Sequence, residues 1–184
     1  LTFIKIDRNI TQKKNNEDLE NNISLDHGGL FHQHFGKIKA TVVIGNNVTR
    51  INNGMFQNLD IWDITIPNSV NSIGEAAFAK CDQLSGISIP SSVTSIGHNA
   101  FYYCNSLSTV DIQESNHQLS IGYQVKNFVT DYEYGPFYDS PLKSISLKRE
   151  LVYKDKNGND FTPDGWEEGV FANKHYDNNG LTTT

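Results

Sequence analysis

Four side chains near the N-terminus carry donor atoms that metal ions favour. Asp26, His27, His32 and His34 lie within a span of nine residues, and imidazole and carboxylate groups are common zinc ligands. Their spacing matches no strong zinc signature, and no cysteine pair accompanies them. We therefore expect solvated loop histidines, with no metal and no other cofactor.

The run Asp155-Lys-Asn157-Gly-Asn159 has the ligand spacing with which a calcium loop begins. That template needs Gly at its sixth position and Glu at its twelfth. This chain has Asp160 and Trp166 there, so the template fails and turn chemistry explains the run better. The Asn157-Gly158 pair suits a type I′ turn, and we expect a β-hairpin over residues 151–161.

No motif in the chain predicts catalysis. There is no Gly-x-Ser-x-Gly elbow, no phosphate-binding glycine loop and no His-Glu-x-x-His helix, so we expect no enzyme activity. Cys81 and Cys104 are 23 residues apart. Stacking of repeats could bring them within disulfide range, but we favour two buried free thiols that pack as small apolar groups.

The element that positions all these residues is an internal repeat. The segment Ile61-Trp-Asp-Ile-Thr-Ile-Pro recurs as Leu84-Ser-Gly-Ile-Ser-Ile-Pro, and the Gly, Phe and Cys that follow recur at the same period of 23. A fixed period in this range is typical of stacked coils. The sequence therefore predicts a repeat solenoid of short parallel strands, turns and short 3₁₀ or helical segments.

The repeat extends along the whole chain with units of unequal length. We expect one solenoid over residues 1–184 and a fragment of a longer protein. Its units are residues 1–38, 39–60, 61–83, 84–106, 107–141 and 142–180, and residues 181–184 begin another. The segment 10–25 is expected to form a hairpin like that of residues 151–161.

Each position of the repeat has an expected role. Isoleucines at period two form a short strand that a proline ends. The shared glycine position is expected to adopt a left-handed turn; it is occupied by Asn52, Gly74, Gly97 and Gly122. The recurring phenylalanines should stack as an internal ladder; they are Phe56, Phe78, Phe101, Phe137 and Phe171.

Charge and hydropathy exclude two classes of function. The formal net charge is −6 and the pI is about 5.4, whereas nucleic-acid binders carry basic stripes. No apolar run approaches the ~20 residues that cross a bilayer. We expect neither nucleic-acid binding nor membrane insertion by this segment.

In its fullest form a unit of the repeat has a strand, then Pro, Val-x-x-Ile-Gly, Ala-Phe-x-x-Cys and Leu along the chain. This pattern resembles the BspA-like subclass of leucine-rich repeats. The units beginning at Ile61 and Leu84 match the family pattern most fully. The other units match only at the main apolar positions of the repeat. The resemblance implies a secreted or cell-surface bacterial protein, from Bacteroidetes, with adhesive or host-protein-binding behaviour. It supplies no catalytic residues.

The candidate binding residues lie on the exposed face of the strands. Eighteen positions are expected there: Thr2, Phe3, Lys5, Ala40, Thr41, Val43, Trp62, Asp63, Thr65, Ser85, Gly86, Ser88, Ser108, Thr109, Asp111, Lys143, Ser144 and Ser146. Most are Ser or Thr. Trp62 and Phe3 are large aromatics, suited to anchoring a ligand or to contact with a neighbouring domain.

A second candidate surface lies in the long unit 107–141. Aromatic residues stand there among short polar ones, which suits contact with a protein or sugar; they are Tyr123, Phe128, Tyr132, Tyr134 and Tyr138, with Asp131 and Glu133. The alternative is that some of these tyrosines fold back over the repeat core.

The sequence thus favours a non-enzymatic extracellular module that binds a protein or glycan in adhesion or host interaction. The expected ligand-binding residues are Phe3, Trp62, Asp63, Thr65, Tyr123, Tyr132 and Tyr134. The alternative is a structural spacer or stalk that displays other domains and has no ligand of its own.

Overall fold

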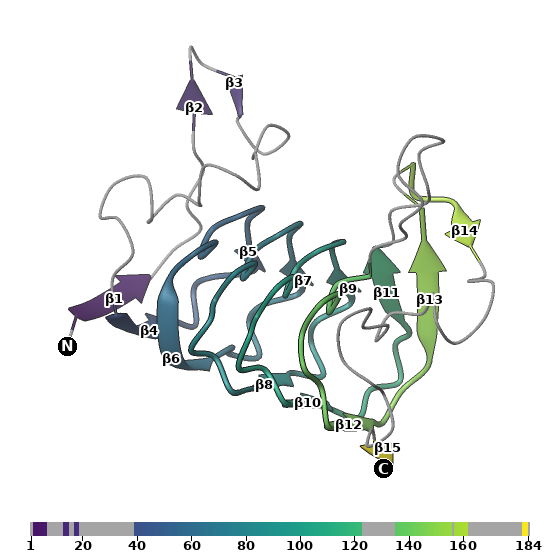
Figure 1. Ribbon diagram of the computed structural model, residues 1–184. Helices are drawn as coiled ribbons and strands as arrows, with labels where there is room; N and C mark the ends of the chain where they lie inside the picture. Colours follow the sequence, from purple (N-terminus) through teal and green to yellow (C-terminus); the bar gives the residue numbers. More distant parts are fainter. Residues whose placement is uncertain are drawn as a thin grey trace, which may run out of the picture.

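The computed structural model describes residues 2–6, 13–14, 17–18, 39–122, 135–155, 157–161 and 182–183. Over these residues the chain winds in successive coils, and equivalent strands of successive coils lie side by side (Figure 1). The predicted repeat solenoid is confirmed. Its coils have three sides, which we call the long-strand side, the short-strand side and the turn side.

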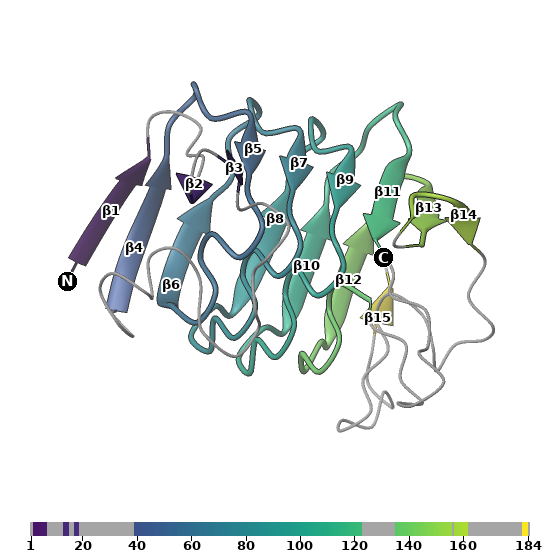
Figure 2. The ribbon, with the colours of Figure 1, turned by 90° about the horizontal axis from the view of Figure 1, so that it is seen from above.

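The long-strand side is built from seven strands that form one row in Figure 2. They belong to two parallel sheets, one in the order β1-β4-β6 and one in the order β15-β12-β10-β8. Their bounds are β1 Thr2–Ile6, β4 Lys39–Ile44, β6 Asp60–Thr65, β8 Gly86–Ile89, β10 Thr109–Ile112, β12 Ser144–Leu147 and β15 Thr182–Thr183.

The short-strand side is one sheet in the order β14-β13-β11-β9-β7-β5. Its strands are β5 Arg50–Ile51, β7 Ser72–Ile73, β9 Ser95–Ile96, β11 Leu119–Gly122, β13 Leu151–Lys154 and β14 Asp160–Phe161. All neighbours are parallel except β13 and β14, which are antiparallel. In two coils a proline, Pro67 or Pro90, ends the preceding long strand because it cannot donate to the ladder, and β7 or β9 begins soon after it.

Both expected hairpins are present in the described residues. The pair β13–β14 confirms the hairpin over residues 151–161. The second pair is antiparallel β2 (Lys13–Lys14) and β3 (Glu17–Asp18), within the segment 10–25.

The turn side comprises residues 52–59, 74–81, 97–104 and 135–140, and its backbone hydrogen bonds alternate. The N–H groups of Gly54, Phe56 and Asn58 donate to carbonyl oxygens of the next coil, at 2.7–2.8 Å. The intervening N–H groups donate three residues back within their own coil. Because half of the donors serve the neighbouring coil, a continuous helix cannot form. The described residues therefore contain turns where short 3₁₀ or helical segments were expected.

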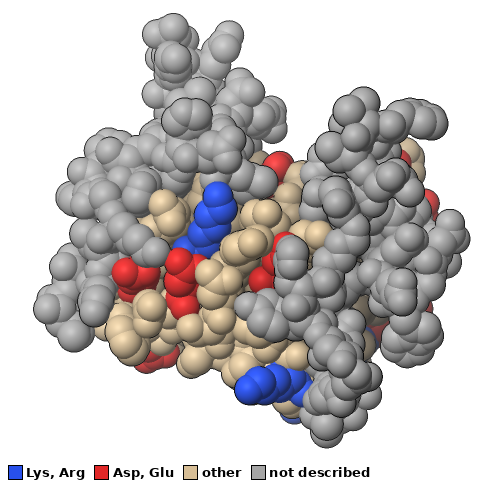
Figure 3. All heavy atoms as spheres, viewed as in Figure 1, with Lys and Arg blue, Asp and Glu red and all other residues tan. Residues whose placement is uncertain are grey.

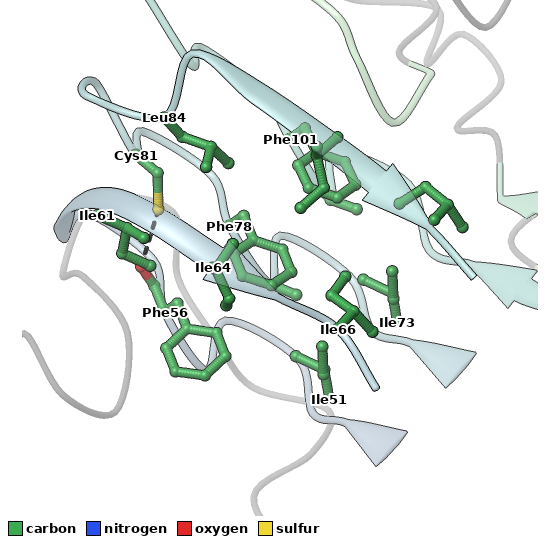
Figure 4. Packing of buried hydrophobic residues seen from close by; sticks show 14 of the residues in the cluster. Ile51, Phe56, Ile61, Ile64, Ile66, Ile73, Phe78, Cys81, Leu84 and Phe101 are labelled. Atoms are coloured by element: carbon green, nitrogen blue, oxygen red, sulfur yellow. Dashed lines mark hydrogen bonds between the residues drawn. The ribbon is translucent and has the colours of Figure 1, made fainter. Parts of the chain in front are cut away.

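The core runs along the axis between the three sides. The rings of Phe56, Phe78, Phe101 and Phe137 stack with successive centroid distances of 5.2, 5.1 and 5.0 Å. Figure 4 shows three of these rings beside the isoleucines of the strands. The predicted ladder is confirmed for these four residues, while Phe171 lies outside the described part of the chain.

The cysteines are free thiols buried in this core. Cys81 Sγ donates to the carbonyl oxygen of Phe56 at 3.2 Å (Figure 4), and Cys104 Sγ donates to that of Phe78 at 3.1 Å. In the next coil Ser140 takes the same place and its Oγ donates to Phe101 O at 2.7 Å. In these three coils a small donor at this position reaches the preceding coil, whereas Leu59 holds the same position in the first described coil.

The prediction of a left-handed conformation at the shared glycine position is wrong. Gly74, Gly97 and Gly122 all have negative φ. A Cβ at Gly97 would lie 2.5 Å from the backbone nitrogen of Glu75, and one at Gly122 would lie 2.6 Å from that of His98. Glycine is therefore required at these three residues because the adjacent coil approaches too closely for a side chain.

Left-handed residues occur instead at two other turn-side positions. One is shared by Gly54, Ala76 and Asn99, with φ of 56°, 50° and 56°. The other is shared by Asn58, Lys80, Tyr103 and Asp139, with φ between 56° and 61°. Only some of these residues are Gly, Asn or Asp, which tolerate a positive φ, so residue type indicates this conformation only weakly.

The turn of the C-terminal hairpin also differs from expectation. A two-residue type I′ turn needs positive φ at both Asn157 and Gly158, but only Gly158 has it, at 81°. Asp155 N donates to Asn159 O at 2.9 Å, which closes a longer loop. Asp155 Oδ1 accepts the N–H groups of Asn157 and Asn159, at 2.8 and 2.9 Å. Turn chemistry thus accounts for the calcium-like spacing.

Candidate functional site: the exposed face of the long-strand side

A β-bulge at Trp62 shapes the exposed face of the long-strand side. In the parallel pair β4–β6, Ala40 lies opposite Ile61 and Thr41 lies opposite Asp63. Trp62 is therefore an extra residue of β6 that the register with β4 skips. Bulges redirect side chains and are frequent at functional sites.

Trp62 is the most exposed large hydrophobic side chain among the described residues, at 55 %. Asp63 and Thr65 are exposed beside it on β6, while Ile61 and Ile64 are buried. Two buried residues three positions apart break the strict alternation of a strand, so two successive residues, Trp62 and Asp63, both face solvent. These three predicted site residues form one continuous exposed segment.

The strand β4 contributes a second apolar side chain to the same face. Val43 is 43 % exposed and lies opposite Thr65. Lys5 of β1 is exposed and lies opposite Val43. The β1–β4–β6 part of the face therefore combines an aromatic ring, an aliphatic side chain and charges of both signs.

The bulge also overturns one of the predicted exposed positions. Ala40 is 1 % exposed, because the register shift places it beside the core residue Ile61. Between its first two inward residues β4 has only Thr41, whereas β6 has Trp62 and Asp63, so the first inward position of β4 is Ala40. Ala40 is a core residue and no part of the candidate site.

Farther along the solenoid the face is polar and internally hydrogen-bonded. Ser88 Oγ donates to Asp111 Oδ2 at 3.3 Å, and Lys148 Nζ lies 3.5 Å from Asp111 Oδ1. Gln113 Nε2 donates to Ser88 Oγ at 3.2 Å. These groups satisfy one another across β8, β10 and the end of β12, which indicates a solvated sheet surface.

The other predicted site residues are only partly placed. Phe3 lies in β1 opposite Thr41, in the same row as Asp63, and its side chain is outside the described part. Tyr123, Tyr132 and Tyr134 lie outside the described residues, as do Asp26, His27, His32 and His34. The structure thus brings Trp62, Asp63 and Thr65 together and aligns Phe3 with them by register.

Two exposed residues were missed by sequence reasoning. Tyr103 is 38 % exposed on the turn side, and Leu147 is 37 % exposed at the end of β12. A signal for Tyr103 was available, because it takes the place that Asn58 and Lys80 hold in earlier units. Leu147 takes a place where Ile112 is fully buried, so its exposure could not be read from residue type.

Charge is dispersed over the described surface. In the view of Figure 3, acidic and basic side chains are interspersed with uncharged surface, with no broad basic patch in the described part. In the ranges the structure describes, no group of three or more His, Cys, Asp and Glu side chains is arranged to hold a metal ion. Among the same residues, no helix has the length and hydrophobicity that crossing a bilayer requires.

Parallel coils with stacked phenylalanines, inward isoleucines and an exposed strand face define a leucine-rich-repeat solenoid. The chain belongs to the BspA type leucine rich repeat family, whose model matches six copies of the repeat over residues 31–157. No curated protein matches the chain significantly. Proteins of this family are typically found at bacterial cell surfaces, and leucine-rich repeats generally mediate protein binding and are generally non-catalytic.

Proposed function

We propose that the chain is an extracellular bacterial surface module that binds a protein or glycan in adhesion or host interaction. The binding face is the β1–β4–β6 part of the long-strand side, with Trp62 as its anchor and with Asp63, Thr65 and Phe3 around it. No catalytic step is part of the proposal.

The exposure of Trp62 is the observation that carries this proposal. Ser85 and Ser108 occupy the same repeat position in the next two coils, so the fold does not require a large side chain there. An indole that is 55 % exposed contributes little to the core. Tryptophan is enriched among residues that dominate binding energy, and family membership supports a binding role.

The size of the face indicates what kind of contact it can make. A standard protein interface uses about 20–30 residues a side, and the whole exposed face offers fewer. The polar groups over β8, β10 and β12 are already hydrogen-bonded to one another. We therefore expect a small contact centred on Trp62, and Tyr123, Tyr132 and Tyr134 of the long unit stay proposed ligand-binding residues from the sequence alone.

The proposal is tested by binding to an immobilised panel of extracellular-matrix proteins, plasma proteins, mucins and glycans. Wild-type protein, verified as monomeric, is compared with Trp62→Ser, a change to the residue that the following coils carry. Saturable binding that the substitution weakens, with an unchanged melting temperature, supports the module. Ser108→Ala, on the same row, is the matched control and should bind as wild type.

A spacer that displays other domains is the second candidate function. The hydrogen-bonded polar surface over β8 and β10 favours it, because that surface is satisfied without a ligand. A spacer has no ligand of its own, so Trp62→Ser should change nothing beyond stability. Silence of the folded protein across the whole panel would favour this function.

A further inference from the structure

We propose that Tyr103 is the contacting ring of a second binding site, on the turn side, that takes a carbohydrate, with the partly exposed Tyr102 beside it and the buried Tyr138 behind Tyr102. The ring centroids of Tyr102 and Tyr103 are 5.1 Å apart and tilted by 59°. Those of Tyr102 and Tyr138 are 5.9 Å apart and nearly parallel, at 10°. This site is on a different side of the coils from Trp62, so it is independent of the proposed function.

The repeat itself does not call for aromatic residues at these positions. The place of Tyr102 is held by Gln57 and Ala79 in the two preceding coils, as the turn-side hydrogen bonds show. The place of Tyr103 is held by Asn58 and Lys80. The coils before the tyrosine cluster thus fold with small or polar side chains at the same points.

Tyr103 is an unfavourable choice for the backbone. Its φ is +56°, a left-handed conformation that asparagine and glycine tolerate better than a bulky residue. The ring is 38 % exposed and so gains only part of the burial that could offset this strain. A residue held in an unfavourable conformation without structural need is a reason to look for a function.

The chemistry of the cluster favours a sugar over a protein. Tyrosine offers a flat π face for the C–H groups of a pyranose ring and a phenol hydroxyl that can donate or accept a hydrogen bond. The other exposed large hydrophobics of the described residues are Val43, Trp62 and Leu147, all on the long strands. Tyr103 is thus the one exposed large hydrophobic side chain of the described turn side, whereas the core of a protein interface is a more apolar patch.

The test is binding of the labelled, monomeric protein to a printed array of neutral and acidic oligosaccharides, followed by titration with the strongest oligosaccharide. We compare Tyr103→Asn and Tyr102→Ala, which introduce residues that earlier coils use at the same places. Both should fold, and Tyr103→Asn should melt at the wild-type temperature or above. We expect each to lose at least about tenfold in affinity, and Tyr103→Phe to lose less.

Two controls separate this site from the long-strand face. Asn58→Gly changes the left-handed position two coils away and should keep wild-type affinity for the oligosaccharide. Trp62→Ser should also keep it, even if it abolishes binding of another ligand to the long-strand face. A silent array, or undiminished binding by folded Tyr103→Asn, would overturn the proposal. If the protein bound no oligosaccharide but bound proteins from which the glycans had been removed, and Tyr103→Asn weakened that binding, the ligand would be a protein and the proposal would be overturned.

Discussion

The phenyl rings of Phe78 and Phe101, 23 residues apart in sequence, stack with centroids 5.1 Å apart and only 5° between their planes. Both side chains are fully buried. The N–H of Phe78 also donates to the carbonyl of Ala100 in the next coil, at 2.7 Å. Ring stacking and backbone pairing thus join the same two coils, and neither coil could bury its ring alone.

Replacing Phe78 by Ala should therefore lower the free energy of unfolding by about 3–5 kcal/mol. The substitution removes the ring from the middle of the ladder and leaves a cavity between Phe56 and Phe101. Urea unfolding followed by far-UV circular dichroism measures the change, and Phe78→Leu should lose distinctly less. A loss below ~1 kcal/mol for the alanine variant would mean that the ladder does not stabilise the coils.

Substitution of Gly97 by Ala should destabilise the chain by about 1–3 kcal/mol or more, because its Cβ would overlap the backbone of the preceding coil. Gly86→Ala is the matched control. The Cβ of that residue would meet Thr109 Oγ1, at 2.5 Å, and this terminal hydroxyl can rotate away. Thermal melts of both variants test the explanation. If the two melted alike, close approach of the coils would not be the reason for glycine at position 97.

The two buried thiols should make the protein less stable in alkali. Desolvation by burial raises the pKa of Cys104 from 9.0 to about 12, and it also raises the pKa of Cys81. The unfolded chain therefore releases these protons first as the pH rises. The thiol contribution to stability is full below about pH 8 and falls between about pH 9 and pH 12.

Chemical denaturation at a series of pH values measures this loss of stability in the wild type and in the double variant Cys81→Ser/Cys104→Ser. Serine is chosen because Ser140 holds the same position in the next coil. The double variant should show a shallower decline between pH 9 and pH 11. Equal slopes would contradict the assignment. Native thiols should also react with a thiol reagent only as fast as the chain opens.

Much of the fold could be predicted from the sequence because the repeat constrains every coil alike. The regular spacing of Phe56, Phe78 and Phe101 was enough to predict one buried ladder, because each ring takes the same place in its coil. The role of Gly97 could not be predicted in the same way. Close contact and left-handed backbone both select glycine, and only the arrangement of neighbouring coils distinguishes them.

The candidate site was predicted in part for a similar reason. Trp62, Asp63 and Thr65 were recognised because residues between inward positions face solvent. Ala40 was misplaced because the bulge at Trp62 depends on how β4 and β6 pair, which a single strand does not reveal. Tyr103 was missed because its exposure arises from a left-handed turn that the residue type does not favour.

The most direct test of the binding account is the dissociation constant of Trp62→Ser for the strongest ligand of the extracellular panel, measured beside its melting temperature. Loss of an anchoring tryptophan typically weakens binding by about 2 kcal/mol or more, roughly thirtyfold. We predict a loss of that size at an unchanged melting temperature, with Ser108→Ala equal to wild type. Undiminished affinity of the folded Trp62→Ser protein would contradict the assignment of the binding face.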